Sequence, residues 1–495
     1  MNVKASLVRN TLWHGLVTLV GLGSGLVTSV LLARGLGPER MGDFSYVTWA
    51  WAALEAVATL GLAVATARYT ADRIARGDVP GAWGFARHFL TRQLLATSLV
   101  VAGALLLVHG LAPAHLRVPL VIVTVALVPV TVESIHTHAL YGAQRYDVTA
   151  RLSTLKMSLQ IAVVAAVLAL GGGLTAVFAG FAVTLVVSCA LVRRAARRVY
   201  GSPAGAVPAG ARGEMRRYLV AVSTVAVLDA IVWDRSEVFF LGLWGDARDI
   251  AFYSLAFGLA TRAMIVPEIA AGALLPAFAA LHGGGQRADF EDVYRAALRY
   301  VALAGALVTA LVAALAPGIV VLLYGEPYRP AAGLLTALVA VALVSALRQV
   351  AWAALPAVGD RRSAVAATLV GAVVNLALAA WLIRAHGTAG AVVANAAGQL
   401  IATTWVFVAM ARRHGVRVPA WDLGRIAAAA GPAFLVTSVT GAGADDLDPG
   451  RLVLGAAAGS LTFLTICALS GVLGRREWDA VRSRRPWRAA GIAPR

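Results

Sequence analysis

Long apolar stretches recur along the whole 495-residue chain, and short polar segments that carry most of the charges separate them. Each stretch is about 20 residues long, which is the length an α-helix needs to cross the hydrocarbon core of a bilayer. A transmembrane β-barrel would show short alternating segments instead. The pattern predicts an all-α polytopic membrane protein with about fourteen transmembrane helices. The predicted spans are residues 12–33, 44–66, 93–111, 119–140, 153–170, 174–192, 218–242, 251–280, 298–324, 331–353, 363–384, 388–410, 425–441 and 451–473.

A weak internal repeat indicates how these spans are grouped. Gly142 precedes Gly173 by 31 residues, and Gly359 precedes Gly390 by 31 residues, each pair in the order inner loop, span and outer turn. Segment 193–217 lies between the two halves, and its basic ends and Gly/Pro/Ala middle are typical of a linker. The repeat predicts two six-helix bundles related by a parallel pseudo-two-fold axis, with a substrate site between them. Chance similarity between Gly/Ala-rich helices is the alternative.

Two hairpins support the same repeat, since residues 31–46 resemble residues 240–254. The last two spans lie outside it and form an addition to the second bundle. The predicted domains are an N-terminal six-helix bundle (1–192), a basic cytoplasmic linker (193–217), a C-terminal six-helix bundle (218–411), two extra helices (412–474) and a basic cytoplasmic tail (475–495).

Composition and charge agree with a membrane protein. The chain is 59% hydrophobic and 14% charged, whereas soluble domains are about 25% charged. The net charge of +18 would suggest nucleic acid in a soluble protein. Here the charges lie in loops between apolar runs, which favours contact with anionic lipid headgroups and no nucleic-acid partner. The two cysteines lie in apolar runs, so no disulfide, metal site or cofactor is expected.

The basic residues also predict the orientation. Of the 43 Lys and Arg residues, 34 fall in alternate segments that include Lys4, Lys156 and Arg348, and seven fall in the others. Because basic residues keep loops on the cytoplasmic side, both termini are expected to be cytoplasmic in a multi-pass protein of the plasma membrane.

The stretch 229–276 departs most from the apolar pattern. It comprises two spans joined by a hairpin at 244–250, and it places several charges inside or beside those spans: Asp229, Asp234, Arg235, Glu237, Arg262 and Glu268. A charge at the bilayer centre costs at least about 2.5–3.5 kcal/mol, so such residues face the protein interior or a wet cavity. The stretch therefore predicts part of the wall of a polar path through a membrane transporter.

Three segments carry a family resemblance, namely ARGLGPERMGDFSYV, RSEVFFLGLWGDARDIAFYSLA and APGIVVLLYGEPYRPAAGLL. They resemble Wzx-type oligosaccharide flippases, the polysaccharide branch of the multidrug/oligosaccharidyl-lipid/polysaccharide (MOP) superfamily. The resemblance extends over essentially the whole chain. It implies a V-shaped pair of six-helix bundles with a central cavity. It also implies export of undecaprenyl-diphosphate-linked sugars from the inner to the outer leaflet by alternating access.

Arg262 is the strongest substrate-binding candidate because it lies in the middle of a span, too deep to reach the interface easily. A guanidinium can bind the oxygens of a diphosphate in a bidentate way. A structural ion pair with a nearby acid is the alternative. Trp233 and Arg235, in the preceding span, are further substrate-binding candidates.

Acidic residues in the spans are candidates for cavity or coupling groups. Asp229 and Glu237 share one helical face with Trp233, and Asp234 lies at its edge. The other candidates are Glu55, Glu133 and Glu268, and the last follows Pro267 in a helix expected to kink. Neutral buried carboxyls or solvated helix ends are the alternatives. A coupling H⁺ or Na⁺ is the one small ligand that these acids suggest.

Several functions remain open at this point. A peptidoglycan-precursor flippase and a drug/cation antiporter belong to the same superfamily, and an acidic cavity would favour the antiporter. A membrane glycan polymerase or ligase would need a large outer loop, and a scaffold would use only the basic tail. The partners expected are a lipid-linked saccharide, the anionic bilayer surface and polysaccharide polymerase machinery.

Overall fold

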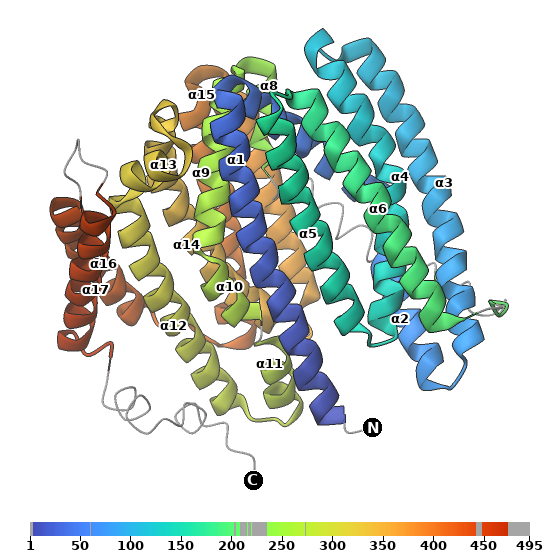
Figure 1. The fold of residues 1–495 in the computed structure, drawn as a ribbon. Coiled ribbons are helices and arrows are strands. Elements are labelled where there is room, and N and C mark those ends of the chain that lie inside the picture. Colours follow the sequence, from blue (N-terminus) through green and yellow to red (C-terminus); the bar gives the residue numbers. More distant parts are fainter. Residues whose placement is uncertain are drawn as a thin grey trace. The chain divides into compact units, whose positions relative to one another are not determined.

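The computed structural model describes residues 3–59, 61–201, 204–207, 215, 219, 235–272, 274–441 and 448–473. All regular secondary structure in these residues is helical (Figure 1). Eleven helical segments of the described residues, counting α10 and α11 together as one, are long and apolar enough to cross a membrane. The predicted all-α polytopic fold is therefore confirmed.

The helices follow one another closely along the chain. Those before residue 245 are α1 (Val3–Thr59), α2 (Leu62–Ala75), α3 (Val79–Leu111), α4 (Ala114–Gly142), α5 (Tyr146–Ala169), α6 (Leu174–Tyr200) and α8 (Glu237–Trp244). Those after it are α9 (Ala247–Ala263), α10 (Ile265–Gly272), α11 (Leu275–Gly283), α12 (Arg287–Ala314), α13 (Ala316–Tyr324), the 3₁₀ turn η1 (Glu326–Tyr328), α14 (Ala331–Ala357), α15 (Arg361–His414), α16 (Ala420–Gly441) and α17 (Pro449–Leu469).

The chain divides into two compact units. The first comprises Met1–Gly242 with Asp246–Ala251, and the second comprises Leu243–Gly245 with Phe252–Arg495. Residues 193–200 of the predicted linker 193–217 form the last turns of α6, so the linker prediction is wrong at its start. Much of the rest of the linker and most of the predicted span 218–242 lie outside the described residues. The predicted domain limits therefore stay a prediction.

Two of the helices are each a pair of spans. A straight α1 of 57 residues would be about 85 Å long, whereas a bilayer core is about 30 Å thick. α1 is interrupted at Gly37 (φ 77°, ψ 171°), and α15 is interrupted at Gly387 (φ 53°, ψ −132°). A residue with a Cβ is strained at such positive φ values, so glycine permits the reversal. Each of these helices therefore corresponds to two of the predicted spans.

The two hairpins that resemble each other in sequence pack together within the first unit. Arg248 and Glu39 form an ion pair at 2.7 Å. A Cβ on Gly42 would lie 1.6 Å from the carbonyl oxygen of Ala247, so only glycine allows the two backbones to approach this closely. Residues 39 and 42 of the first hairpin and residues 247 and 248 of the second thus make direct contact within the first unit.

Aromatic stacking fills the core of the first unit beside α4. The rings of Trp83 and Tyr200 stack with centroids 5.1 Å apart, and the Tyr200 hydroxyl donates to the Ala139 carbonyl at 2.6 Å. Buried aromatic rings contribute a large share of the stability of a protein core. This packing fixes α3, α4 and α6 against one another.

A proline break in the second unit separates α12 from α13, where the sequence predicted one span over 298–324. Pro317 has no N–H to donate to the carbonyl of Ala313, one helical turn earlier. Thr336 Oγ1 on α14 donates to that carbonyl at 3.1 Å. This hydrogen bond from a neighbouring helix satisfies the Ala313 carbonyl, to which lipid could donate no hydrogen bond.

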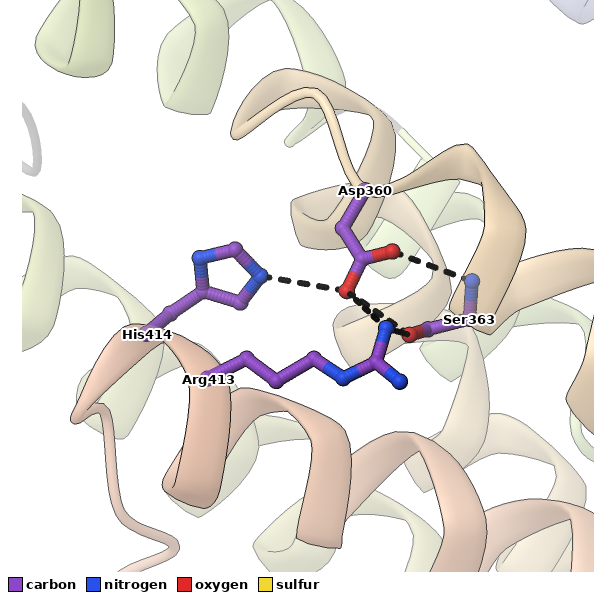
Figure 2. A network of polar contacts seen from close by, with 4 residues as sticks. All are labelled: Asp360, Ser363, Arg413 and His414. Carbon is purple, nitrogen blue, oxygen red and sulfur yellow. Dashed lines mark hydrogen bonds and ion pairs between the residues drawn. The ribbon is translucent and has the colours of Figure 1, made fainter.

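Figure 2 shows a polar cluster that joins the two ends of α15. Asp360 is the N-cap of α15, and its carboxylate accepts hydrogen bonds from Ser363 N (3.1 Å) and Ser363 Oγ (2.7 Å). His414 Nε2 lies 3.3 Å from Asp360 Oδ2, and Arg413 Nη1 donates to Ser363 Oγ at 2.9 Å. The first and last turns of the helical hairpin are therefore tied together.

The Asp360 carboxylate is stabilised in its charged form. Burial alone would raise its pKa, but the hydrogen bonds from Ser363 and His414 and the charge of Arg413 outweigh burial and lower the pKa to about 2. A carboxylate whose pKa is depressed by folding stabilises the protein above its unfolded pKa, and this stability is lost as the pH falls through the folded pKa.

We expect Asp360→Ala to destabilise the purified protein by about 1–3 kcal/mol, because both an N-cap and charge-assisted hydrogen bonds are lost. Asp360→Asn keeps the cap and should cost less. Thermal melts between pH 4 and pH 2 should show a steeper loss of stability in the wild type than in Asp360→Asn. Equal slopes would contradict the role of the charge.

Candidate functional site

The helix that carries Arg262 is broken one residue after α9 ends. Pro267 lacks an N–H, and its ring would clash with the carbonyl of Ala263. The N–H of Met264 instead donates to Thr261 O at 3.2 Å, and helical bonding resumes with Glu268 N to Met264 O at 3.0 Å. The prediction of one helix over 251–280 is wrong, because this stretch forms α9, α10 and α11. Broken helices at membrane depth line cavities or substrate sites in transporters.

Arg262 lies in the last turn of α9, directly before this break, and is half-buried. Its guanidinium lies back over the preceding turn, since Nη1 is 2.8 Å from the place where a Cβ on Gly258 would be. Gly258 therefore leaves the space that the guanidinium occupies. Whether Arg262 contacts substrate stays a prediction.

Arg348 is a second cation inside the spans of the second unit. It lies within α14 and is only 8% exposed. α14 packs against α10, and the charge of Arg348 acts on the half-buried Glu268. The predicted orientation counts Arg348 with the basic residues of a cytoplasmic segment, whereas the structure places it, buried, within α14. Two guanidinium groups and one carboxylate thus occupy the spans around the helix break.

The first unit holds a separate ionic cluster on three helices. Lys156 Nζ on α5 donates to both carboxylate oxygens of Glu133 on α4, at 3.0 and 3.2 Å. Ser188 Oγ on α6 donates to the same carboxylate at 3.0 Å. The side chains of Lys156 and Glu133 are 28% and 14% exposed, so most of both charged groups is removed from the surface. The pair offsets the cost of placing each charge inside the membrane.

Glu55 adds a second carboxylate to this cluster. It lies half-buried on the second leg of α1, and the charges of Lys156 and Glu133 both act on it. α1 packs against α4 and α5. Two carboxylates against one ammonium leave the cluster with one negative charge when all three groups are ionised. Such a cluster suits a proton or a small monovalent cation.

The structure describes only some of the other residues that the sequence predicts for the site. Glu237 is fully buried in the first turn of α8, where the helix dipole favours a negative charge. Arg235 precedes it with a left-handed backbone (φ 57°), so the described helix starts at Glu237. Trp233, Asp229 and Asp234 lie outside the described residues.

The sequence carries a signal for the two cations inside the spans, Lys156 and Arg348. Lys156 lies inside the predicted span 153–170, and Arg348 lies inside the predicted span 331–353. Both were counted with the adjacent loops. Lys156 and Lys4 are also the chain's only lysines. A charge within a predicted span is a functional candidate by default.

Solved structures of transporters share this fold. An inward-facing multidrug resistance MATE family transporter of the MOP superfamily matches with a TM-score of 0.68 and 18% identity, covering 79% of this chain and 94% of its own. The lipid II flippase MurJ, in an inward closed conformation, matches with a TM-score of 0.73 and 12% identity, covering 93% and 99%. A MOP superfamily transporter from Pyrococcus furiosus matches with a TM-score of 0.56 and 16% identity, covering 82% and 95%.

A family model decides the classification, since the model for polysaccharide biosynthesis proteins matches residues 7–282, more than half of the chain. The chain belongs to the polysaccharide biosynthesis protein family. A second model, for the lipid II flippase MurJ, matches residues 253–447. No curated protein matches. The resemblance to the MOP superfamily is thereby confirmed, and the clusters described above lie inside the spans of a polysaccharide biosynthesis protein with a transporter fold.

Glu133 and Lys156 should behave as a coupled pair in this family member. Lys156→Ala leaves the Glu133 carboxylate without its cation and should cost about 2 kcal/mol, less than the 3–5 kcal/mol of a fully buried pair. The double variant Glu133→Gln/Lys156→Met should recover part of that loss. Thermal melts of the single and double variants measure the coupling.

Ser188→Ala is the matched control for this pair. It removes one neutral hydrogen-bond donor from the same carboxylate and should cost about 1 kcal/mol. The cycle for the pair uses the single variants Glu133→Gln and Lys156→Met with their double variant, and strictly additive losses in these three would refute the coupling.

Proposed function

We propose that the chain is a flippase that moves undecaprenyl-diphosphate-linked oligosaccharide from the inner to the outer leaflet of the plasma membrane by alternating access. The observation that carries the proposal is the presence of Arg262 and Arg348 inside the spans of the second unit, beside a broken helix. Membership of the polysaccharide biosynthesis protein family supports it.

The charge of the substrate explains the need for these arginines. A diphosphate is an anion with planar sets of oxygens, which match the fork of a guanidinium. Without a carrier, the free energy needed to move this headgroup and its sugars through the hydrocarbon layer would far exceed thermal energy. Arg262 and Arg348 would replace water around the diphosphate while the lipid tail stays in the bilayer.

The membrane potential favours this direction of transport. With the inside negative, each negative charge moved outward gains about 2.3 kcal/mol per 100 mV. The Glu55, Glu133 and Lys156 cluster offers a place for a counter-transported H⁺ or Na⁺, which would add to this driving force. The coupling ion is part of the proposal.

A lipid II flippase is the second candidate, because the MurJ model matches residues 253–447. Both candidates use a polyprenyl diphosphate, so the two arginines suit either. A drug/cation antiporter is less favoured, since two guanidinium groups against one carboxylate would repel a cation. The sugar attached to the diphosphate separates the two flippases.

Arg262→Ala and Arg348→Ala should each lower translocation by about tenfold to a hundredfold, the value of one hydrogen bond to a charged group. Leaflet-resolved labelling of lipid-linked glycan in cells measures this. Arg361→Ala is the matched control, because Arg361 is exposed at the first position of α15. Undiminished transport in both arginine variants would overturn the proposal.

Gly258 provides a test of Arg262 that leaves its charge in place. A Cβ at position 258 would displace the guanidinium, which is the flexible end of a side chain. Gly258→Ala should therefore reduce translocation while the melting temperature stays equal or rises, since alanine favours the helix by about 1 kcal/mol. Full transport in Gly258→Ala would show that the position of the guanidinium does not matter.

A further inference from the structure

A cavity of about 580 Å³ lies within the first unit, at the end of the bundle where α6 finishes. α3, α4 and α6 form its walls. On the predicted orientation this end of the bundle is cytoplasmic. The cavity is distinct from the Glu133 and Lys156 cluster, because neither residue lines it.

Among the described residues, three arginines and no acidic residue line this cavity. Arg87 comes from α3, and Arg193 and Arg197 come from α6. Within the described part of the chain, no carboxylate forms an ion pair with any of the three. Arg193 and Arg197 are one helical turn apart, where like charges repel. An anion in the cavity would remove this repulsion.

The back of the cavity is rigid and buried. Trp83 is 7% exposed and stacks on Tyr200, and its ring centroid is 6.0 Å from that of His136. His136 is 3% exposed, and its Nδ1 lies 2.7 Å from the Val132 carbonyl. These packed rings hold α3, α4 and α6 in place, and the exposed side chains of Arg87, Arg193 and Arg197 lie along the walls of the cavity.

An apolar surface continues from the cavity along the same helices. Leu94 lines the cavity, and Leu95 and Leu99 on α3 are 64% and 76% exposed. On α6, Val183 and Val186 are 62% and 56% exposed, and Val186 shares a helical face with Arg193 and Arg197. Val186 is seven positions before Arg193, about 10 Å along the helix on the same face. A basic pocket that continues into an exposed apolar face matches a lipid, with its headgroup in the pocket and its chains along the helices.

We propose that this pocket binds the phosphate headgroup of an anionic membrane phospholipid. The arginine forks would bind the phosphate oxygens, and the acyl chains would lie against α3 and α6. Basic pockets between transmembrane helices on the cytoplasmic side bind anionic headgroups for the same reason. The site would hold a phospholipid that is retained, in addition to any lipid that is transported.

Native mass spectrometry of the purified full-length protein tests this. The protein is titrated with dioleoyl phosphatidylglycerol and, separately, with dioleoyl phosphatidylcholine of the same chains. We expect tighter binding of phosphatidylglycerol. Arg87→Ala should weaken it about fivefold, and Arg193→Ala/Arg197→Ala about 25-fold, at about fivefold per arginine.

The control is Arg194→Ala/Arg198→Ala, which removes two exposed arginines of the same helix that do not line the cavity. It should change binding less than twofold. Equal weakening by the pocket variant and the control would overturn the proposal, because binding would then follow net charge alone.

Two further arms keep the result interpretable. Thr91→Trp fills the cavity without removing a charge and should weaken phosphatidylglycerol binding as strongly as the arginine variants. It tests the pocket even if the double arginine variant folds poorly. Inorganic phosphate should not displace the lipid at matched concentration. Displacement by phosphate at that concentration would identify a soluble anion site and overturn the lipid assignment, as would unchanged binding in Thr91→Trp.

Discussion

The cost of an unsatisfied polar group in hydrocarbon governs this structure. Lipid offers no hydrogen bonds, so each backbone break inside a span needs a partner from the protein. At Pro317 the freed carbonyl of Ala313 receives the hydroxyl of Thr336. Charges obey the same rule, since Lys156 inside the first unit binds both oxygens of Glu133. The polar residues of the spans are therefore gathered into clusters.

The two units satisfy this rule with opposite charge. In the first unit the cluster of Glu55, Glu133 and Lys156 carries one more carboxylate than ammonium. In the second unit Arg262 and Arg348 outnumber Glu268 near the broken helix. A carrier that moves an anion against a cation needs both kinds of cluster. On the proposed function, the cluster of the second unit would serve the anion and that of the first unit the cation.

The sequence predicted the helices well because hydrophobic length is set by the bilayer. The predicted spans 363–384 and 388–410 are the two legs of α15, which meet at Gly387. Side-chain partners could not be predicted, because they depend on tertiary packing. Asp360 and Arg413 are 53 residues apart and meet only through that hairpin. The kink expected near Pro267 was correct in kind, but the clash of the proline ring places the break at Met264. The basic pocket needs three helices and leaves no local motif.

The interruption at Met264 has a mechanical consequence. Its N–H already donates to Thr261 and not to the residue four positions back. Fewer regular backbone hydrogen bonds therefore oppose a tilt of α10 relative to α9 than in an unbroken helix. We expect bending to concentrate at this joint, directly after Arg262, the last charged residue of α9. Reorientation of the flanking segment can thus proceed without partial unfolding in the lipid.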